Sequence, residues 1–189
     1  IGVLMSIPGQ TMGVSVFTDH LIAALGISRV KLSIAYMIGT ISSALILSPA
    51  GKLYDRYGAR IVGGSAAIGL AAVLVWLSQV DRTATALAGT PGTMVGFLLV
   101  TVGFLGIRFF GQGMLTMVSN NMVVKWFEKR RGLATGIMGA FMAFGFSAAP
   151  RLLDTLVASY GWRGAWLVCA LIVGVCFPLV AVTLFRDDP

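Results

Sequence analysis

Six long runs of uncharged, mostly apolar residues constrain this chain more than any other feature. The runs are 1–18, 32–51, 61–80, 83–124 (interrupted only by Arg108), 132–150 and 164–185. A helix needs about 20 apolar residues to cross the ~30 Å hydrocarbon core of a bilayer. Each run is close to that length or longer, so the sequence predicts a protein that crosses a membrane several times.

Composition excludes most other classes of protein. Only 11% of the residues are charged, whereas a soluble domain carries roughly 25%. Membrane-spanning strands alternate apolar and polar residues over ~10 positions, and the runs show no such alternation. The net charge of +7 comes from short basic clusters between the runs, without a basic stripe. We therefore expect an all-α protein in a lipid bilayer and no nucleic-acid partner.

The sequence predicts one bundle over residues 1–189. Its six transmembrane helices are expected at about 1–23, 32–50, 61–80, 93–124, 132–153 and 164–185. The run 83–124 is long enough for two spans, but reading it as one places eight basic residues on one side and five on the other. Positive charge favours the cytoplasmic side, so we expect a multi-pass protein of the cell membrane with both chain ends in the cytoplasm and an outer loop at 83–93.

Two further expectations come from the ends of the chain and from its reactive residues. Ile1 is not an initiator methionine and the last residues resemble the start of a loop, so we expect a fragment of a longer protein. The chain has one histidine, no Cys/His metal spacing and no phosphate-binding loop. Without such motifs, we expect no enzyme, no cofactor and no metal site.

The segment after the second run has a distinctive pattern, G-x-L-x-D-R-x-G-x-R. It reads Gly51-Lys-Leu-Tyr-Asp55-Arg56-Tyr-Gly58-Ala-Arg60. The glycines permit tight turning, and the Asp55 carboxylate can accept hydrogen bonds from a helix N-terminus or from the two arginines. The segment is interpreted either as a conformational latch against another bundle or as a determinant of topology that only keeps positive charge inside.

Arg108 lies near the middle of the fourth predicted helix. A charge at that depth costs at least ~2.5 kcal/mol, so its side chain should face a water-filled cavity or an acceptor. Polar residues on three helices are expected to line this cavity: Arg108, Gln112 and Thr116, Gln10, Thr11 and Ser15, and Tyr36 and Thr40. The pattern predicts a cavity for a small polar solute, where Arg108 contacts an anion directly or instead bonds backbone carbonyls and organises the bundle.

Asp19 and His20 lie at the outer end of the first predicted helix. No acid is expected inside the membrane to balance Arg108, and Asp19 is the nearest candidate by type. The two residues are interpreted as a proton-sensitive gate or as a solvated cap of the helix.

The loop pattern resembles the signature of the major facilitator superfamily. The element Arg108-Phe-Phe-Gly111-Gln-Gly113 looks like the helix 4 motif R-x-x-x-G-x-G of that family, with one residue fewer between Arg and Gly. The segments 126–134 and 161–163 also resemble those that precede helices 5 and 6. Within the family, Pro8-Gly-Gln-Thr11 and these segments look most like monocarboxylate and oxalate/formate-type carriers, although the helix 1 lysine of the monocarboxylate group has no counterpart here.

This resemblance implies the N-terminal half of a secondary transporter that works by alternating access. Its partners would be the C-terminal six-helix half and a small solute, with or without protons. The resemblance also implies that the loop after helix 2 stabilises the outward-facing state and that the helix 4 arginine can serve proton coupling. We expect the solute to be an organic anion such as a monocarboxylate. The alternatives are an uncharged solute or drug, or a receptor or scaffold that does not transport.

Overall fold

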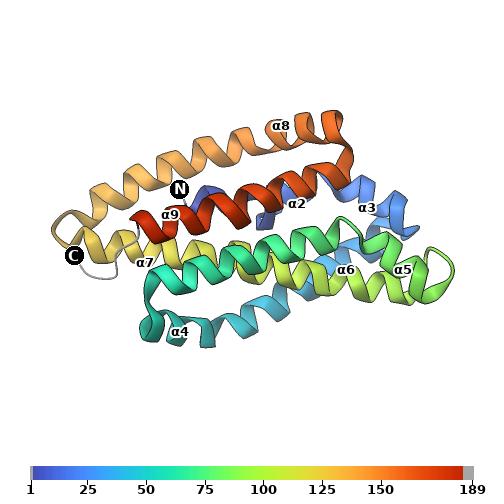
Figure 1. The fold of residues 1–189 in the computed structure, drawn as a ribbon, viewed down its shortest axis with the longest axis horizontal. Coiled ribbons are helices and arrows are strands. Elements are labelled where there is room, and N and C mark those ends of the chain that lie inside the picture. The colour runs from blue at the N-terminus through green and yellow to red at the C-terminus, as the bar shows by residue number, and fades with distance from the viewer. Residues whose placement is uncertain (1, 185–189) are drawn as a thin grey trace.

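The computed structural model describes residues 2–184, which are almost entirely helical and contain no strand. The elements are α1 (Gly2–Met5), the 3₁₀ turn η1 (Ile7–Gly9), α2 (Thr11–Ser15), α3 (Thr18–Leu25), α4 (Arg29–Leu77), α5 (Val80–Ala88), α6 (Met94–Ile107), the π-helix η2 (Arg108–Leu115), α7 (Thr116–Trp126), the 3₁₀ turn η3 (Glu128–Arg130), α8 (Arg131–Leu171), the π-helix η4 (Ile172–Cys176) and α9 (Phe177–Leu184). They form an elongated bundle in which the long helices run side by side (Figure 1).

Three segments are long and apolar enough to cross a membrane, namely Arg29–Leu77, Met94–Trp126 and Arg131–Thr183. The first and third each turn back on themselves (Figure 1), so the three segments hold five antiparallel helices. The broken helical stretch over 2–25 precedes them, which makes six. We number these six helices in chain order: helix 1 covers 2–25, helix 2 29–57, helix 3 59–77, helix 4 94–126, helix 5 131–160 and helix 6 162–184. The predicted all-α membrane fold is confirmed.

Both reversals occur at a single glycine within the same pattern, Tyr-Gly-x-Arg. Gly58 has φ 77° and ψ 172°, and Gly161 has φ 69° and ψ 166°, a backbone conformation that glycine adopts without steric cost. Because one such residue reverses the chain, helical backbone extends up to it on both sides. The loop predicted over 51–60 is therefore wrong, and the helices expected to end at 50 and 153 continue to the reversals. We refer to the two ends of the bundle as the Gly58 end and the Gly161 end.

The first predicted helix is not continuous. It breaks at η1, where Pro8 lacks the backbone N–H that a helix interior requires, and Gln10 is extended with φ −83° and ψ 157°. Close packing accompanies the break, since a Cβ added to Gly9 would lie 2.3 Å from the Ile107 carbonyl oxygen. The break brings the backbone of helix 1 against helix 4.

The outer loop predicted at 83–93 is also partly wrong, because its first half belongs to α5. Val80 and Ala84 are buried, and Gly89 ends this helix in the left-handed conformation with φ 75°, a common C-terminal signal. The Gly92 amide then donates a hydrogen bond of 2.7 Å to the Leu25 carbonyl. Thus α5 and its loop are tied to the end of α3 at the Gly161 end.

The core is apolar and dense, and it holds helix 1 against helix 6. Phe17 and Trp166 are fully buried and stack with ring centroids 3.8 Å apart. Outward faces remain apolar as well: Leu45 is 74% exposed and Phe144 79% exposed. Such faces are typical of surfaces that contact lipid or another membrane segment.

Candidate functional site

Arg108 is the only charged side chain among the buried residues of the described chain, with 8% of its surface exposed. It is the first residue of the π-helix η2, a type of element that is often found at functional sites. The Arg108 Nη1 atom donates to the Thr11 hydroxyl over 3.4 Å, and its guanidinium carbon lies 5.3 Å from the centre of the Tyr36 ring. Arg108 therefore joins helix 1, helix 2 and helix 4.

Tyr36 is fixed from two sides. Its hydroxyl lies 2.9 Å from the Thr11 hydroxyl, and its ring meets the buried Phe104 ring edge to face, with centroids 5.3 Å apart. The ring is thereby held where its negative π face attracts the guanidinium. The structure brings Arg108, Thr11 and Tyr36 into mutual contact.

A second polar cluster joins the break in helix 1 to helix 4. The Gln10 side-chain amide donates to the Ser6 hydroxyl over 3.0 Å and to the Thr116 hydroxyl over 3.4 Å. The Thr116 hydroxyl lies 3.5 Å from that of Ser6. Gln10 and Thr116 are thus hydrogen-bonded to each other, and the Ser6 hydroxyl, four residues before Gln10, completes the cluster.

The remaining predicted cavity residues form hydrogen bonds within their own helices or have a buried side-chain atom without a hydrogen-bond partner. Ser15 donates to the Met12 carbonyl over 2.8 Å, and Thr40 donates to the Tyr36 carbonyl over 2.8 Å. The Gln112 Oε1 and Arg108 Nε atoms are buried and have no hydrogen-bond partner. Buried polar atoms are almost always paired in native proteins, but five other side-chain atoms of the described residues share this state, among them Arg163 Nε and Trp166 Nε1, so it does not by itself mark a binding site.

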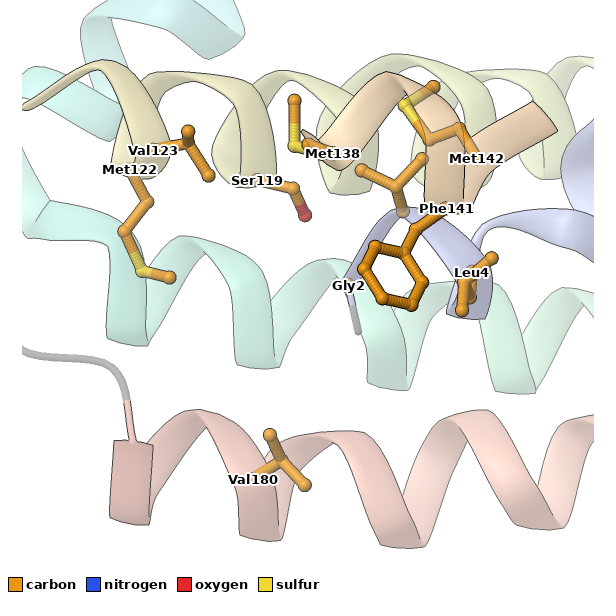
Figure 2. Close-up of a pocket in the computed structure, with 10 residues that line it drawn as sticks. Gly2, Leu4, Ser119, Met122, Val123, Met138, Phe141, Met142 and Val180 are labelled. Carbon is orange, nitrogen blue, oxygen red and sulfur yellow. The ribbon is translucent and has the colours of Figure 1, made fainter. Parts of the chain in front are cut away.

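Two cavities flank these clusters. The smaller, of about 190 Å³, lies between helices 1 and 2, and Thr11 and Tyr36 are among its lining residues. The larger, of about 520 Å³, lies between α1, α7, α8 and α9 and is almost entirely apolar. Figure 2 shows Met138, Phe141 and Met142 of α8 around it, together with Met122 and Ser119 of α7.

The predicted latch residues lie at the Gly58 end. Gly51, Asp55 and Arg56 belong to the helix before the reversal, and Asp55, Arg56 and Arg60 are exposed. Aromatic rings accompany the bases there: Arg56 lies 5.3 Å from the Tyr57 ring centre, and Lys125 lies 4.9 Å from the Tyr54 ring centre. The structure thus gathers exposed charged side chains of the predicted latch at this end of the bundle, above the buried Tyr54.

Charged residues at the Gly161 end form two ion pairs. Asp19 pairs with Arg29, and both side chains are largely exposed, while His20 is exposed beside them. Asp81 pairs with Arg163, both are mostly buried, and the Arg163 guanidinium lies 4.4 Å from the Trp162 ring centre. The Asp81–Arg163 pair could not be found from the sequence, because the two residues are 82 positions apart and were expected in different loops.

Among residues 2–184, no group of His, Cys, Asp and Glu could hold a metal ion.

Comparison with known proteins identifies a matching family and several relatives. The family model of the Major Facilitator Superfamily matches residues 1–189. A probable sulfoacetate transporter of Cupriavidus necator is 30% identical over 86% of this chain and 39% of its own length. Monocarboxylate transporter 1 of Bos taurus is 31% identical over 85% of this chain and 27% of its own length. A probable L-galactonate transporter of Escherichia coli is 24% identical over 86% of this chain and 33% of its own length.

The chain spans about two fifths or less of the length of these curated relatives. No solved structure matches it. The relatives are named as transporters, and none of these three is named as an enzyme. Their names give sulfoacetate, L-galactonate and monocarboxylates as the solutes.

Proposed function

The chain belongs to the major facilitator superfamily, and from this premise we propose that it forms the N-terminal six-helix half of a secondary active transporter of a small organic anion, such as a monocarboxylate. Proteins of this family are transporters and not enzymes, which agrees with the prediction from the sequence. Transport would proceed by rocking of two halves about a site near the middle of the membrane. The second half and the solute are the proposed partners.

One observation carries this proposal: the buried guanidinium of Arg108 has no carboxylate partner within residues 2–184. Its polar contacts are the Thr11 hydroxyl and the Tyr36 ring, and its Nε atom is unpaired. A buried charge is costly unless it is paired. An anionic solute would supply the missing charge, which favours an anion over a neutral solute.

Reconstituted uptake tests the proposal. The transporter that contains this chain is placed in proteoliposomes and offered labelled carboxylates, sugars and drugs, with and without a proton gradient. We expect saturable uptake of a small monocarboxylate that other carboxylates inhibit and an uncharged sugar does not. Binding without uptake would indicate a receptor, and no saturable uptake of any carboxylate would contradict the proposal.

The apolar cavity in Figure 2 favours a second candidate, the transport of an uncharged solute or drug. Met122, Met138 and Met142 line it, and flexible methionine side chains adapt to ligands of different shapes. The same uptake panel separates the candidates, because an apolar drug would be carried without competition from carboxylates.

We further propose that the protein lies in the cell membrane with both chain ends in the cytoplasm. The Gly58 end carries Lys52, Arg56, Lys125 and Arg130, and positive charge favours the cytoplasmic side. A cysteine introduced at Lys129 tests this orientation. We expect a thiol reagent that does not cross the membrane to block its labelling in inverted vesicles and not in right-side-out vesicles.

Asp55→Asn tests the proposed latch at the Gly58 end. We expect normal membrane insertion and about tenfold slower uptake, because loss of the carboxylate removes a charge-assisted contact worth ~1.4 kcal/mol to the second half. Asp154→Asn, an exposed acid on α8, is the matched control and should transport normally. Wild-type uptake by the Asp55→Asn protein would leave this segment as a determinant of topology only.

Asp19→Asn tests the proposed proton site at the Gly161 end, where His20 is its neighbour. We expect the pH dependence of uptake to become flatter, because the variant side chain cannot exchange a proton. The dependence of initial uptake rate on external pH is the measurement. If the variant keeps the full dependence, Asp19 caps the helix and pairs with Arg29 without a role in coupling.

A further inference from the structure

The smaller cavity, beside Arg108, has an unusual lining for a membrane protein. Five of its eight lining residues carry hydroxyl groups: Thr11, Ser15, Thr18, Ser33 and Tyr36. Its volume of about 190 Å³ equals the space of about six water molecules, at ~30 Å³ for each. The cavity can therefore hold a compact solute that carries several polar groups.

The hydrogen bonds of these hydroxyls determine what the cavity offers. Ser15 donates its proton to the Met12 carbonyl over 2.8 Å, and Thr18 donates to the Val14 carbonyl over 3.5 Å. With the protons directed to the backbone, the two oxygens present lone pairs as acceptors. This part of the lining favours a solute with O–H or N–H donors.

Donors are concentrated at Arg108. Arg108 does not itself line the cavity, but its guanidinium donates to Thr11 and lies over the Tyr36 ring, and both of these residues line it. A carboxylate accepts hydrogen bonds from a guanidinium, and hydroxyl groups on the same molecule would donate to Ser15 and Thr18.

We propose that this cavity binds the hydroxylated body of the solute, so that the transporter prefers hydroxylated monoanions of the sugar-acid class, from glycerate to gluconate. The inference rests on the proposed function, since it assigns a substrate class to the same site. It makes Ser15 and Thr18 determinants of specificity, whereas Arg108 determines only the charge.

Backbone-bonded hydroxyls are common in helices, which supplies a matched control. Thr155 on α8 donates to the Arg151 carbonyl over 2.9 Å with the same four-residue spacing as Thr18, and it is exposed. It lines neither of the two cavities described above. Only a hydroxyl that faces the cavity should influence which solute is carried.

Competition for uptake tests the inference in proteoliposomes that hold the transporter containing this chain. Labelled gluconate and glycerate are the probes, and the competitors are gluconate, hexanoate, glycerate, propionate and the uncharged polyol glucitol. We expect each hydroxy acid to inhibit at concentrations at least about tenfold below its unsubstituted counterpart, and glucitol not to inhibit. A site that hydrogen-bonds a hydroxyl discriminates against the analogue that lacks it.

A pair of variants then assigns the effect to residues. Ser15→Ala combined with Thr18→Val is expected to raise the KM for gluconate about tenfold, while the inhibition constant of propionate and the maximal rate change less than about twofold. Thr155→Val should behave as wild type. The thermal stability of each purified protein in detergent shows whether a loss of uptake reflects unfolding.

The outcomes separate this inference from the proposed function. Equal competition by hydroxylated and unsubstituted acids, with no effect of the double variant, would overturn the inference and leave anion transport standing. Absence of saturable uptake for every acid would overturn both. Transport of glucitol at the same rate as gluconate would replace the anion with a neutral polyol.

Discussion

Replacement of Arg108 by glutamine is expected to lower anion uptake about 100-fold. The buried guanidinium meets no carboxylate within the described chain, and its nearest hydrogen-bond partner is the Thr11 hydroxyl. Removal of one member of a buried charge pair costs 2–5 kcal/mol, and a loss of ~2.7 kcal/mol corresponds to a factor of about 100. The initial rate of uptake at low substrate concentration is the measurement.

Two further variants show whether charge or geometry is responsible. Arg108→Lys keeps the charge but loses the planar group that binds a carboxylate through two hydrogen bonds, so we expect an intermediate loss of about tenfold. Arg151→Gln removes an exposed arginine of α8 and should transport as wild type. If Arg108→Gln retained uptake within about twofold of wild type, the guanidinium would not bind the solute.

Exchange of internal for external solute without a proton gradient separates binding from coupling. If Arg108 binds the anion, the glutamine variant loses both exchange and gradient-driven uptake. If it serves only proton coupling, the variant keeps exchange and loses gradient-driven uptake. If it only organises the bundle, both decline together with the melting temperature of the protein.

Much of the fold could be predicted because the bilayer imposes a strong pattern. The helices, the reversal region with Gly58 and the residues of the Arg108 group can all be inferred from apolar run length and from the cost of a charge in lipid. The ends of helices were less predictable. A single glycine with positive φ reverses the chain at Gly58 and at Gly161. The polar segments on either side of each glycine, which we expected to form loops, are therefore helical.

The pairing of polar side chains could not be predicted, because it depends on irregular backbone. The expected polar stripe of Arg108, Gln112 and Thr116 assumed α-helical spacing through helix 4. The π-helix Arg108–Leu115 adds one residue to a turn and so rotates the next turns of the helix by about 100°. Arg108 therefore reaches Thr11 while Thr116 reaches Gln10, and the single expected cavity becomes two clusters.

Substitution of Gly9 by alanine is expected to destabilise the protein by ~3 kcal/mol. The added Cβ would lie 2.3 Å from the Ile107 carbonyl oxygen and 2.9 Å from the Gly111 Cα. Both are backbone atoms, so the clash is relieved only if the break in helix 1 moves away from the π-helix of helix 4. Overpacking costs typically 1–3 kcal/mol and occasionally more, so the melting temperature of the protein should fall.

A series of glycine variants tests this account through the order of their stabilities. At Gly111 the added Cβ would meet its first neighbour at 2.9 Å, so Gly111→Ala should destabilise less than Gly9→Ala. Gly64, within α4, has nothing within 4 Å of its added Cβ, and Gly64→Ala should raise stability by up to ~1 kcal/mol because alanine favours helix. Thermal unfolding in detergent, followed by tryptophan fluorescence, measures all three. Equal melting temperatures for Gly9→Ala and Gly64→Ala would mean that helices 1 and 4 do not meet backbone to backbone. The Arg108–Thr11 contact depends on that approach, so the anion site would then need a different geometry.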